Sequence, residues 1–104
     1  MTLELNESNF KNTIEKGVAL IEFWAPWCGP CKMMSPLIDK IANNNPDLIV
    51  GKVDIDASQN ISQMYNIQSI PTIIIFKNGE AMEQTVGVVN EKTIMNKVES
   101  VKSS

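Results

Sequence analysis

The sequence contains no arginine and no histidine among its 104 residues. Without arginine the chain lacks the bidentate donor that best recognises phosphate and guanine, and its formal net charge of -3 repels a phosphate backbone. Nucleic acid is therefore not expected as a partner. Without histidine the chain lacks the base of a Cys-His protease and the commonest ligand of catalytic metal sites.

Cysteine and long apolar runs are also scarce. The only cysteines are Cys28 and Cys31, which cannot complete a tetrahedral metal site within one chain or a multi-disulfide framework. No apolar run approaches the roughly 20 residues of a membrane span, and residues 1–6 lack the basic and apolar segments of a signal peptide. We therefore expect a cytoplasmic protein with no metal and no membrane partner, in which residues 1–104 form one domain.

Hydrophobic periodicity predicts strands and helices in the order β-α-β-α-β-α-β-β-α. Strands are expected at residues 3–5, 18–25, 48–55, 72–77 and 81–86. The expected helices are one capped by Asn6 or Ser8 that stops at Gly17, one over 30–43, one that buries Ile61, Met64 and Tyr65, and one capped by Asn90. Asn78-Gly79 predicts a type I′ hairpin turn. Right-handed crossovers then predict an α/β fold, a three-layer sandwich around a mixed central sheet.

The two cysteines lie where a buried strand meets the second helix. Pro30 suits the first turn of that helix, so Cys28 is expected at its N-terminus, beside free backbone N–H groups that stabilise a thiolate. Cys31 can then attack a mixed disulfide intramolecularly, at a high effective concentration. The pair is interpreted as nucleophile and resolving thiol. Half of a zinc knuckle or two incidental buried cysteines are the alternatives.

Several motifs, in order and spacing, resemble the thioredoxin family across essentially the whole chain. They are Phe23-Trp24-Ala25-Pro26-Trp27-Cys28-Gly29-Pro30-Cys31-Lys32, the helix proline Pro36, Ile70-Pro71-Thr72, Phe76-Lys77-Asn78-Gly79 and Gly87. The resemblance implies a thioredoxin fold, with a five-stranded mixed sheet flanked by four helices. It also implies protein-disulfide oxidoreductase activity with no bound cofactor, and a Cys28–Cys31 disulfide in the oxidised form.

The resemblance further implies roles for the residues around the dithiol. Cys28 would be the exposed attacking thiol and Cys31 the buried resolving thiol, with Pro71 in a cis peptide bond against them. The substrate-docking surface would comprise Trp27, Gly29, Pro30, Ile70, Pro71, Gly87 and Val88. For Trp27 and Ile70, ordinary core packing is the alternative.

Glu22 is the main departure from the family's sequence pattern, because the family more often has aspartate at this position. Leu20, Glu22 and Trp24 point to one face of their strand, so the carboxylate is expected between apolar neighbours, where burial raises its pKa. We interpret Glu22 as the proton acceptor for Cys31, acting through a water molecule. The alternative is a longer side chain that reaches solvent and has no catalytic role.

Lys52 matches the family's buried lysine near that carboxylate. Pairing with Glu22 would offset the desolvation of both charges. A solvated strand lysine is the alternative.

By analogy with the family, the expected partners are a thioredoxin reductase, supplied with electrons by NADPH or ferredoxin, and disulfide-containing client proteins. The Gly-Pro pair resembles the reducing members, and a monomer is the default for such a carrier. Two rival functions remain: an oxidising or isomerising relative, and a binding module in which the dithiol is dispensable.

Overall fold

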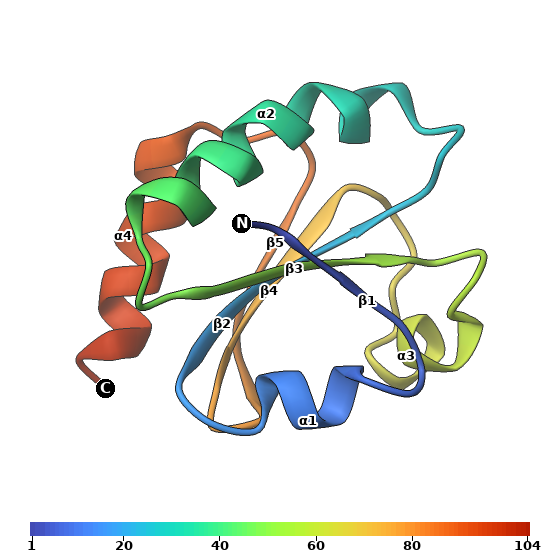
Figure 1. Ribbon diagram of the computed structural model, residues 1–104. Helices are drawn as coiled ribbons and strands as arrows, with labels where there is room; N and C mark the ends of the chain where they lie inside the picture. The colour runs from blue at the N-terminus through green and yellow to red at the C-terminus, as the bar shows by residue number, and fades with distance from the viewer.

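A mixed five-stranded sheet forms the centre of the fold in a computed structural model that describes residues 1–104 (Figure 1). The elements along the chain are β1 (Leu3–Leu5), α1 (Phe10–Ile14), β2 (Val18–Trp24), α2 (Gly29–Asn44), β3 (Ile49–Asp54), α3 (Gln59–Met64), β4 (Thr72–Lys77), β5 (Glu80–Val86) and α4 (Glu91–Lys102). This order, with its five strands and four helices, confirms the prediction from the sequence.

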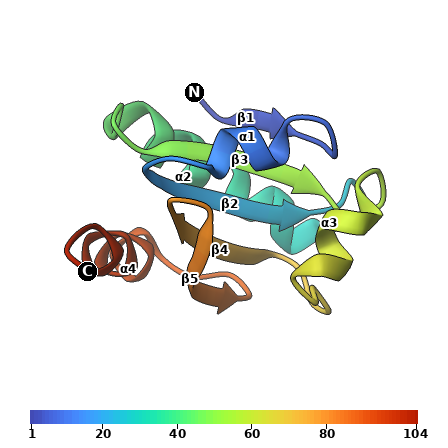
Figure 2. The same ribbon diagram turned by 90° about the horizontal axis from the view of Figure 1, so that it is seen from below.

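The strand order across the sheet is β1-β3-β2-β4-β5 (Figure 2). β1, β3 and β2 run parallel, whereas β4 is antiparallel to β2 and to β5. The parallel part follows from the helical crossovers, and the antiparallel part follows from the hairpin that joins β4 to β5. β2 is therefore a central strand, and its carboxyl end leads directly into α2.

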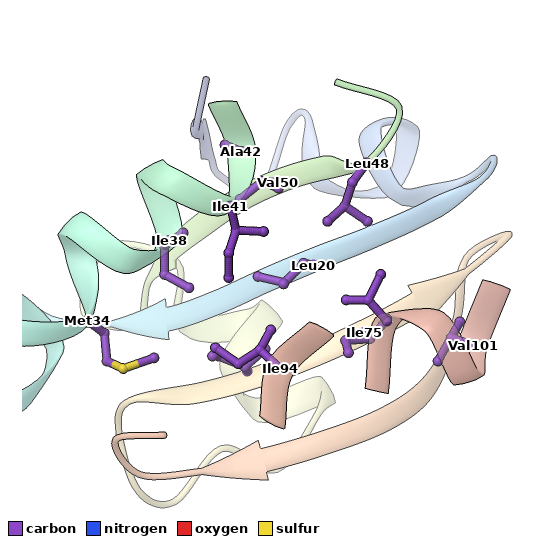
Figure 3. Close-up of a cluster of buried hydrophobic side chains, with 12 residues drawn as sticks. Leu20, Met34, Ile38, Ile41, Ala42, Leu48, Val50, Ile75, Ile94 and Val101 are labelled. Atoms are coloured by element: carbon purple, nitrogen blue, oxygen red, sulfur yellow. The ribbon is translucent and has the colours of Figure 1, made fainter. Parts of the chain in front are cut away.

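The helices cover both faces of the sheet, and each face has its own hydrophobic cluster. One cluster lies between the sheet and the pair α2 and α4, and Figure 3 shows it with side chains from Leu20, Met34, Ile38 and Ile94 pointing toward one another. The other lies under α1 and α3 and contains the aromatic rings of Phe10, Phe23 and Phe76. Cores on both faces hold β2 rigidly, which fixes the position where α2 begins.

Strand parity along β2 divides its side chains between the two clusters. Ile21 and Phe23 belong to the cluster under α1 and α3, whereas Leu20 belongs to the cluster under α2 and α4. Because alternate residues of a strand face the same side, Glu22 shares the side of Leu20. The sheet therefore directs the only charged side chain of β2 toward α2.

Local turn and capping chemistry is confirmed at two expected places. The Asn90 side chain accepts a hydrogen bond from the backbone N–H of Thr93 at 2.9 Å and so caps α4. Asn78 and Gly79 have φ values of 52° and 87°, the positive values that a type I′ hairpin turn requires.

Two local predictions are wrong. α1 begins after Asn9 and not at a cap formed by Asn6 or Ser8, because the Asn6 side chain accepts hydrogen bonds from the backbone N–H groups of Ser8 and Asn9 in a turn before the helix. Met64 is exposed, because α3 ends there and the Tyr65 ring packs in the aromatic cluster instead.

None of the helices is both long enough and apolar enough to cross a membrane.

Candidate functional site

Cys28 and Cys31 are joined by a disulfide at the junction between β2 and α2, with their Cα atoms 5.3 Å apart. Cys28 occupies the N-cap of α2 in an extended conformation, and its sulfur lies 3.2 Å from the backbone nitrogen of Cys31. The Cys28 N–H donates to the carbonyl oxygen of Ala25 at 3.1 Å, which closes the turn after β2. The helix N-terminus thus presents backbone N–H groups to this sulfur, the environment that lowers a thiol pKa.

Both cysteines are buried in the disulfide form, with exposed fractions of 4% for Cys28 and 2% for Cys31. The expectation that Cys28 is exposed is therefore wrong for this state. The reason is local packing, because the disulfide lies against Ala25 and Ile70 and is covered further by Trp24 and Ile55.

The loop before β4 reaches the disulfide from the other side of the site. The Ile70–Pro71 peptide bond is cis, as the family resemblance implied, and the Ile70 carbonyl oxygen lies 4.0 Å from the Cys28 sulfur. Pro71 is buried, and its carbonyl oxygen accepts a hydrogen bond from the N–H of Gly87 at 2.8 Å. Gly87 has a φ of +93°, a conformation that glycine adopts without steric cost. Segments 70–71 and 87–88 therefore meet beside the dithiol.

Trp27 lies on the surface, directly before Cys28 in the segment between β2 and α2. It is 68% exposed, which excludes the core-packing alternative. Its indole N–H donates a hydrogen bond of 2.7 Å to Asp56, and the backbone N–H of Asp56 in turn donates to Asp54 at 2.9 Å. The ring is thereby fixed while most of its area remains accessible.

Gly29, Pro30 and Val88 are also exposed, whereas Ile70 is half-buried between the disulfide and the cluster under α1 and α3. Ile70 therefore contributes to the core as well as to the surface beside the dithiol. The docking surface that the family resemblance implies for these residues stays a prediction.

Asp56 is a site residue that the sequence analysis missed. It lies just beyond the carboxyl end of β3, and β3 is parallel to β2. Carboxyl ends of parallel strands meet at one edge of a sheet, so an acidic residue after β3 could have been placed near the dithiol from its position alone.

Glu22 is the buried carboxylate of the site, with an exposed fraction of 2%. This burial excludes the alternative of a side chain that reaches solvent. Desolvation raises the pKa of Glu22 from its ordinary value of 4.5 to about 7, although the charge of Lys52 lowers it and that of Asp39 raises it. Burial therefore places the titration of this group near neutral pH.

A small cavity of about 50 Å³ connects Glu22 with the dithiol. It is lined by Glu22, Trp24, Cys31, Lys32, Ser35 and Lys52. Oε2 of Glu22 and the indole nitrogen of Trp24 are buried without a hydrogen-bond partner. The volume suffices for a water molecule, and the two polar atoms are the kind of partners that such a water requires.

Lys52 does not pair with Glu22, so that prediction is wrong. Its ammonium group lies 3.2 Å from a carboxylate oxygen of Glu4, which comes from β1. Because β3 lies between β1 and β2, Lys52 is in register with Glu4 on one side and with Glu22 on the other. Its ammonium group forms the ion pair with Glu4, on the edge strand. Its effect on Glu22 is therefore electrostatic and not a direct bond.

A larger hollow of about 650 Å³ lies between α1, the end of α3 and the β4–β5 turn. None of the residues around the dithiol or Glu22 lines it. No group of three or more histidine, cysteine or acidic side chains is arranged to hold a metal ion. Cys28 and Cys31 are the only cysteines of the chain, so its thiol chemistry takes place at this dithiol.

A parallel sheet with an antiparallel hairpin, a dithiol at the N-terminus of α2 and an adjoining cis-proline loop define a thiol–disulfide oxidoreductase. The sequence model of the Thioredoxin family matches residues 1–100. The chain belongs to the thioredoxin family. It is a protein-disulfide oxidoreductase that works by thiol–disulfide exchange.

Curated relatives cover most of the chain. A thioredoxin of Chlamydia trachomatis is 39% identical over 95 residues, which are 91% of this chain and 93% of that protein. An M-type chloroplastic thioredoxin of Chlamydomonas reinhardtii is 44% identical over 98 residues, which are 91% of this chain and 70% of that protein. A thioredoxin of Staphylococcus epidermidis is 40% identical over 88 residues, which are 82% of this chain and 83% of that protein.

Proposed function

We propose that the protein is a reducing dithiol carrier that transfers two electrons from a thioredoxin reductase to disulfides of client proteins. The observation that carries this proposal is the position of Cys28, whose sulfur caps α2 beside the Ile70 carbonyl. A thiolate formed there is stabilised by the helix N-terminus and faces the loop on which a client segment would lie. NADPH or ferredoxin would supply the reductase with electrons.

The proposed cycle has two exchanges. The Cys28 thiolate attacks one sulfur of the client disulfide, so that a Cys28–client disulfide forms and the other client sulfur leaves as a thiolate. Cys31 then loses its proton and attacks the Cys28 sulfur, which releases the second client thiolate and leaves the Cys28–Cys31 disulfide. The client gains two electrons and the carrier loses two, which the reductase later restores.

The surface beside the dithiol is the proposed docking site for the client. It would combine the exposed apolar area of Trp27 and Val88 with the backbone of segments 70–71 and 87–88, which are joined by the hydrogen bond from Gly87 to Pro71. Backbone pairing with an extended segment gives affinity for many sequences, which suits a carrier with several clients. Gly29 and Pro30 would complete the surface on the α2 side.

Glu22 is the proposed proton acceptor for Cys31. The cavity that both residues line would hold the connecting water, and a pKa of about 7 lets the carboxylate both accept and release a proton at neutral pH. Lys52 would modulate this carboxylate by its charge.

Reductase-coupled turnover of a protein disulfide, followed from pH 5.5 to 8.5, tests this proposal with the wild type and Glu22→Gln. With the wild type, the reductase is expected to oxidise NADPH as the carrier passes the electrons to insulin disulfides, at a rate that rises through about pH 7 as Glu22 ionises. Glu22→Gln should lose that inflection and slow the resolving step by about 10- to 100-fold at neutral pH. Glu22→Asp, which keeps a carboxylate, serves as the control and should retain an inflection. An unchanged profile in Glu22→Gln would exclude the proton-acceptor role.

The same substitution has an independent effect on stability. The folded-state pKa of Glu22 is raised above its ordinary value of 4.5, so the contribution of this group to stability is greatest below pH 4.5 and is lost as the pH rises through about 7. Above that range the buried charge costs about 3 kcal/mol, and Glu22→Gln should recover much of it. Urea unfolding at pH 5 and pH 8 measures this difference.

The carrier is proposed to act in the cytoplasm and to be a monomer. A dithiol is maintained where the thiol pool is reducing, and a freely diffusing monomer can meet reductase and client in turn. Fractionation of the source cells checks the compartment, and sedimentation velocity checks the oligomeric state; recovery from an organelle or a stable dimer would contradict this assignment.

A further inference from the structure

Three charged side chains form a row across neighbouring strands beside the Glu22 cavity. Lys52 on β3 is in register with Glu4 on β1 and with Glu22 on β2. Residues in register on adjacent strands project from the same face of the sheet. Lys52 therefore has one acidic neighbour at the edge of the sheet and another in its interior.

The ammonium group of Lys52 contacts Glu4, the outer member of this row, and the ring of Trp24 on β2. It lies 3.2 Å from the Glu4 carboxylate and 4.7 Å from the centre of the Trp24 ring. The Lys52 side chain is 25% exposed and that of Glu4 is 72% exposed, so the pair lies at the surface. Glu22, in contrast, is buried with one carboxylate oxygen unpartnered.

Two contacts thus oppose movement of Lys52 toward Glu22. An ammonium group must lose most of its hydration to reach a buried carboxylate, whereas pairing with Glu4 leaves part of that hydration in place. Lys52 would also have to leave its cation–π contact with the Trp24 ring, which belongs to β2 and lines the same cavity as Glu22. A direct bond to Lys52 would stabilise the ionised form of Glu22 and make it a weaker base.

We propose that Glu4 is a positioning residue for disulfide exchange, which holds Lys52 over Trp24 and away from Glu22 so that Glu22 remains able to accept a proton. The inference deepens the proposed function and rests on the proton-acceptor role of Glu22. Glu4 acts through Lys52 and does not touch the dithiol.

Among the groups around Glu22, Lys52 is the cation that forms an ion pair with Glu4. α2 contributes Asp39, which raises the pKa of Glu22, and Lys32, which lines the cavity. β4 contributes the neutral Ile73 in register with Glu22. The charge of Lys52 lowers the pKa of Glu22 already at its present position.

The test is a ¹³C NMR titration of the Glu22 carboxyl group in the intact oxidised protein. Glu4→Gln is expected to free Lys52 and to lower the titration midpoint by about 0.3–0.7 pH units, a two- to five-fold change in the proton-binding constant. The inflection in the rate of exchange should move by the same amount. Glu7→Gln, which removes the same charge from an exposed glutamate with no ion pair, is the control and should shift neither.

A Lys52→Met background shows whether Glu4 acts through Lys52. In that background Glu4→Gln should leave the Glu22 midpoint unchanged, whereas Glu4→Asp in the wild-type background should restore part of the normal midpoint. The proposal is overturned if Glu4→Gln does not lower the titration midpoint of Glu22. It is also overturned if Glu4→Gln lowers this midpoint by the same amount in the Lys52→Met background. If the midpoint shifts but Glu22→Gln leaves exchange unaltered, the control of Glu22 by Glu4 stands and the proton-acceptor role fails.

Discussion

Replacing Cys28 by serine is expected to lower disulfide-reductase turnover by about 1,000-fold or more, because a serine hydroxyl remains protonated where the thiol forms a thiolate. The loss should appear in both exchanges, since Cys28 contributes the attacking sulfur in the first and the attacked sulfur in the second. The measurement is reductase-coupled reduction of insulin, with unfolding monitored in parallel to show that the variant is folded.

Ala81→Ser is a suitable control, because it introduces the same side chain at an exposed position of β5. It should retain wild-type turnover. If Cys28→Ser retained a biological activity of the protein in full, that activity would belong to a binding module and not to dithiol exchange.

Cys31→Ser is expected to stop the cycle after the first exchange. Cys28 can still attack, but the resolving thiol, whose intramolecular position is worth an effective concentration of roughly 10⁵ M or more, is gone. The variant should therefore accumulate as a one-to-one mixed disulfide with a client, visible as a band on a non-reducing gel that dithiothreitol removes. Turnover should fall by about 100-fold or more, because only external thiols can release the client.

The trapped complex also tests the docking surface. Trp27 and Val88, which are exposed in the free protein, should become protected in it, whereas exposed Met64 on α3 should not. Protection around Met64 alone would contradict the proposed surface. Failure of Cys31→Ser to form any mixed disulfide would contradict the assignment of Cys28 as the attacking thiol.

Features that depend on neighbouring residues could be predicted from the sequence. The alternation along β2 placed Glu22 between apolar neighbours, and the structure buries it. The hairpin turn at Asn78-Gly79 and the Asn90 cap also follow from local backbone chemistry. The Cys28–Cys31 pair was recognisable because its strand-to-helix context is local as well.

Features that depend on register between distant segments could not be predicted in this way. The partner of Lys52 is Glu4 because β1 adds to the free edge of β3, and no local pattern reveals that pairing. The burial of Cys28 depends on Ile70, which lies 42 residues away in the chain. The hydrogen bond between Trp27 and Asp56 likewise requires the loop after β3 to turn toward the dithiol.

The equilibrium redox potential of the Cys28–Cys31 pair tests the central claim most directly. It can be titrated in dithiothreitol buffers and followed by the fluorescence of Trp24 and Trp27, which lie beside the disulfide. A reducing carrier should give a value near −270 mV, below the glutathione range of roughly −220 to −260 mV. A value near −200 mV or above would make the protein an oxidase or isomerase and would contradict the account.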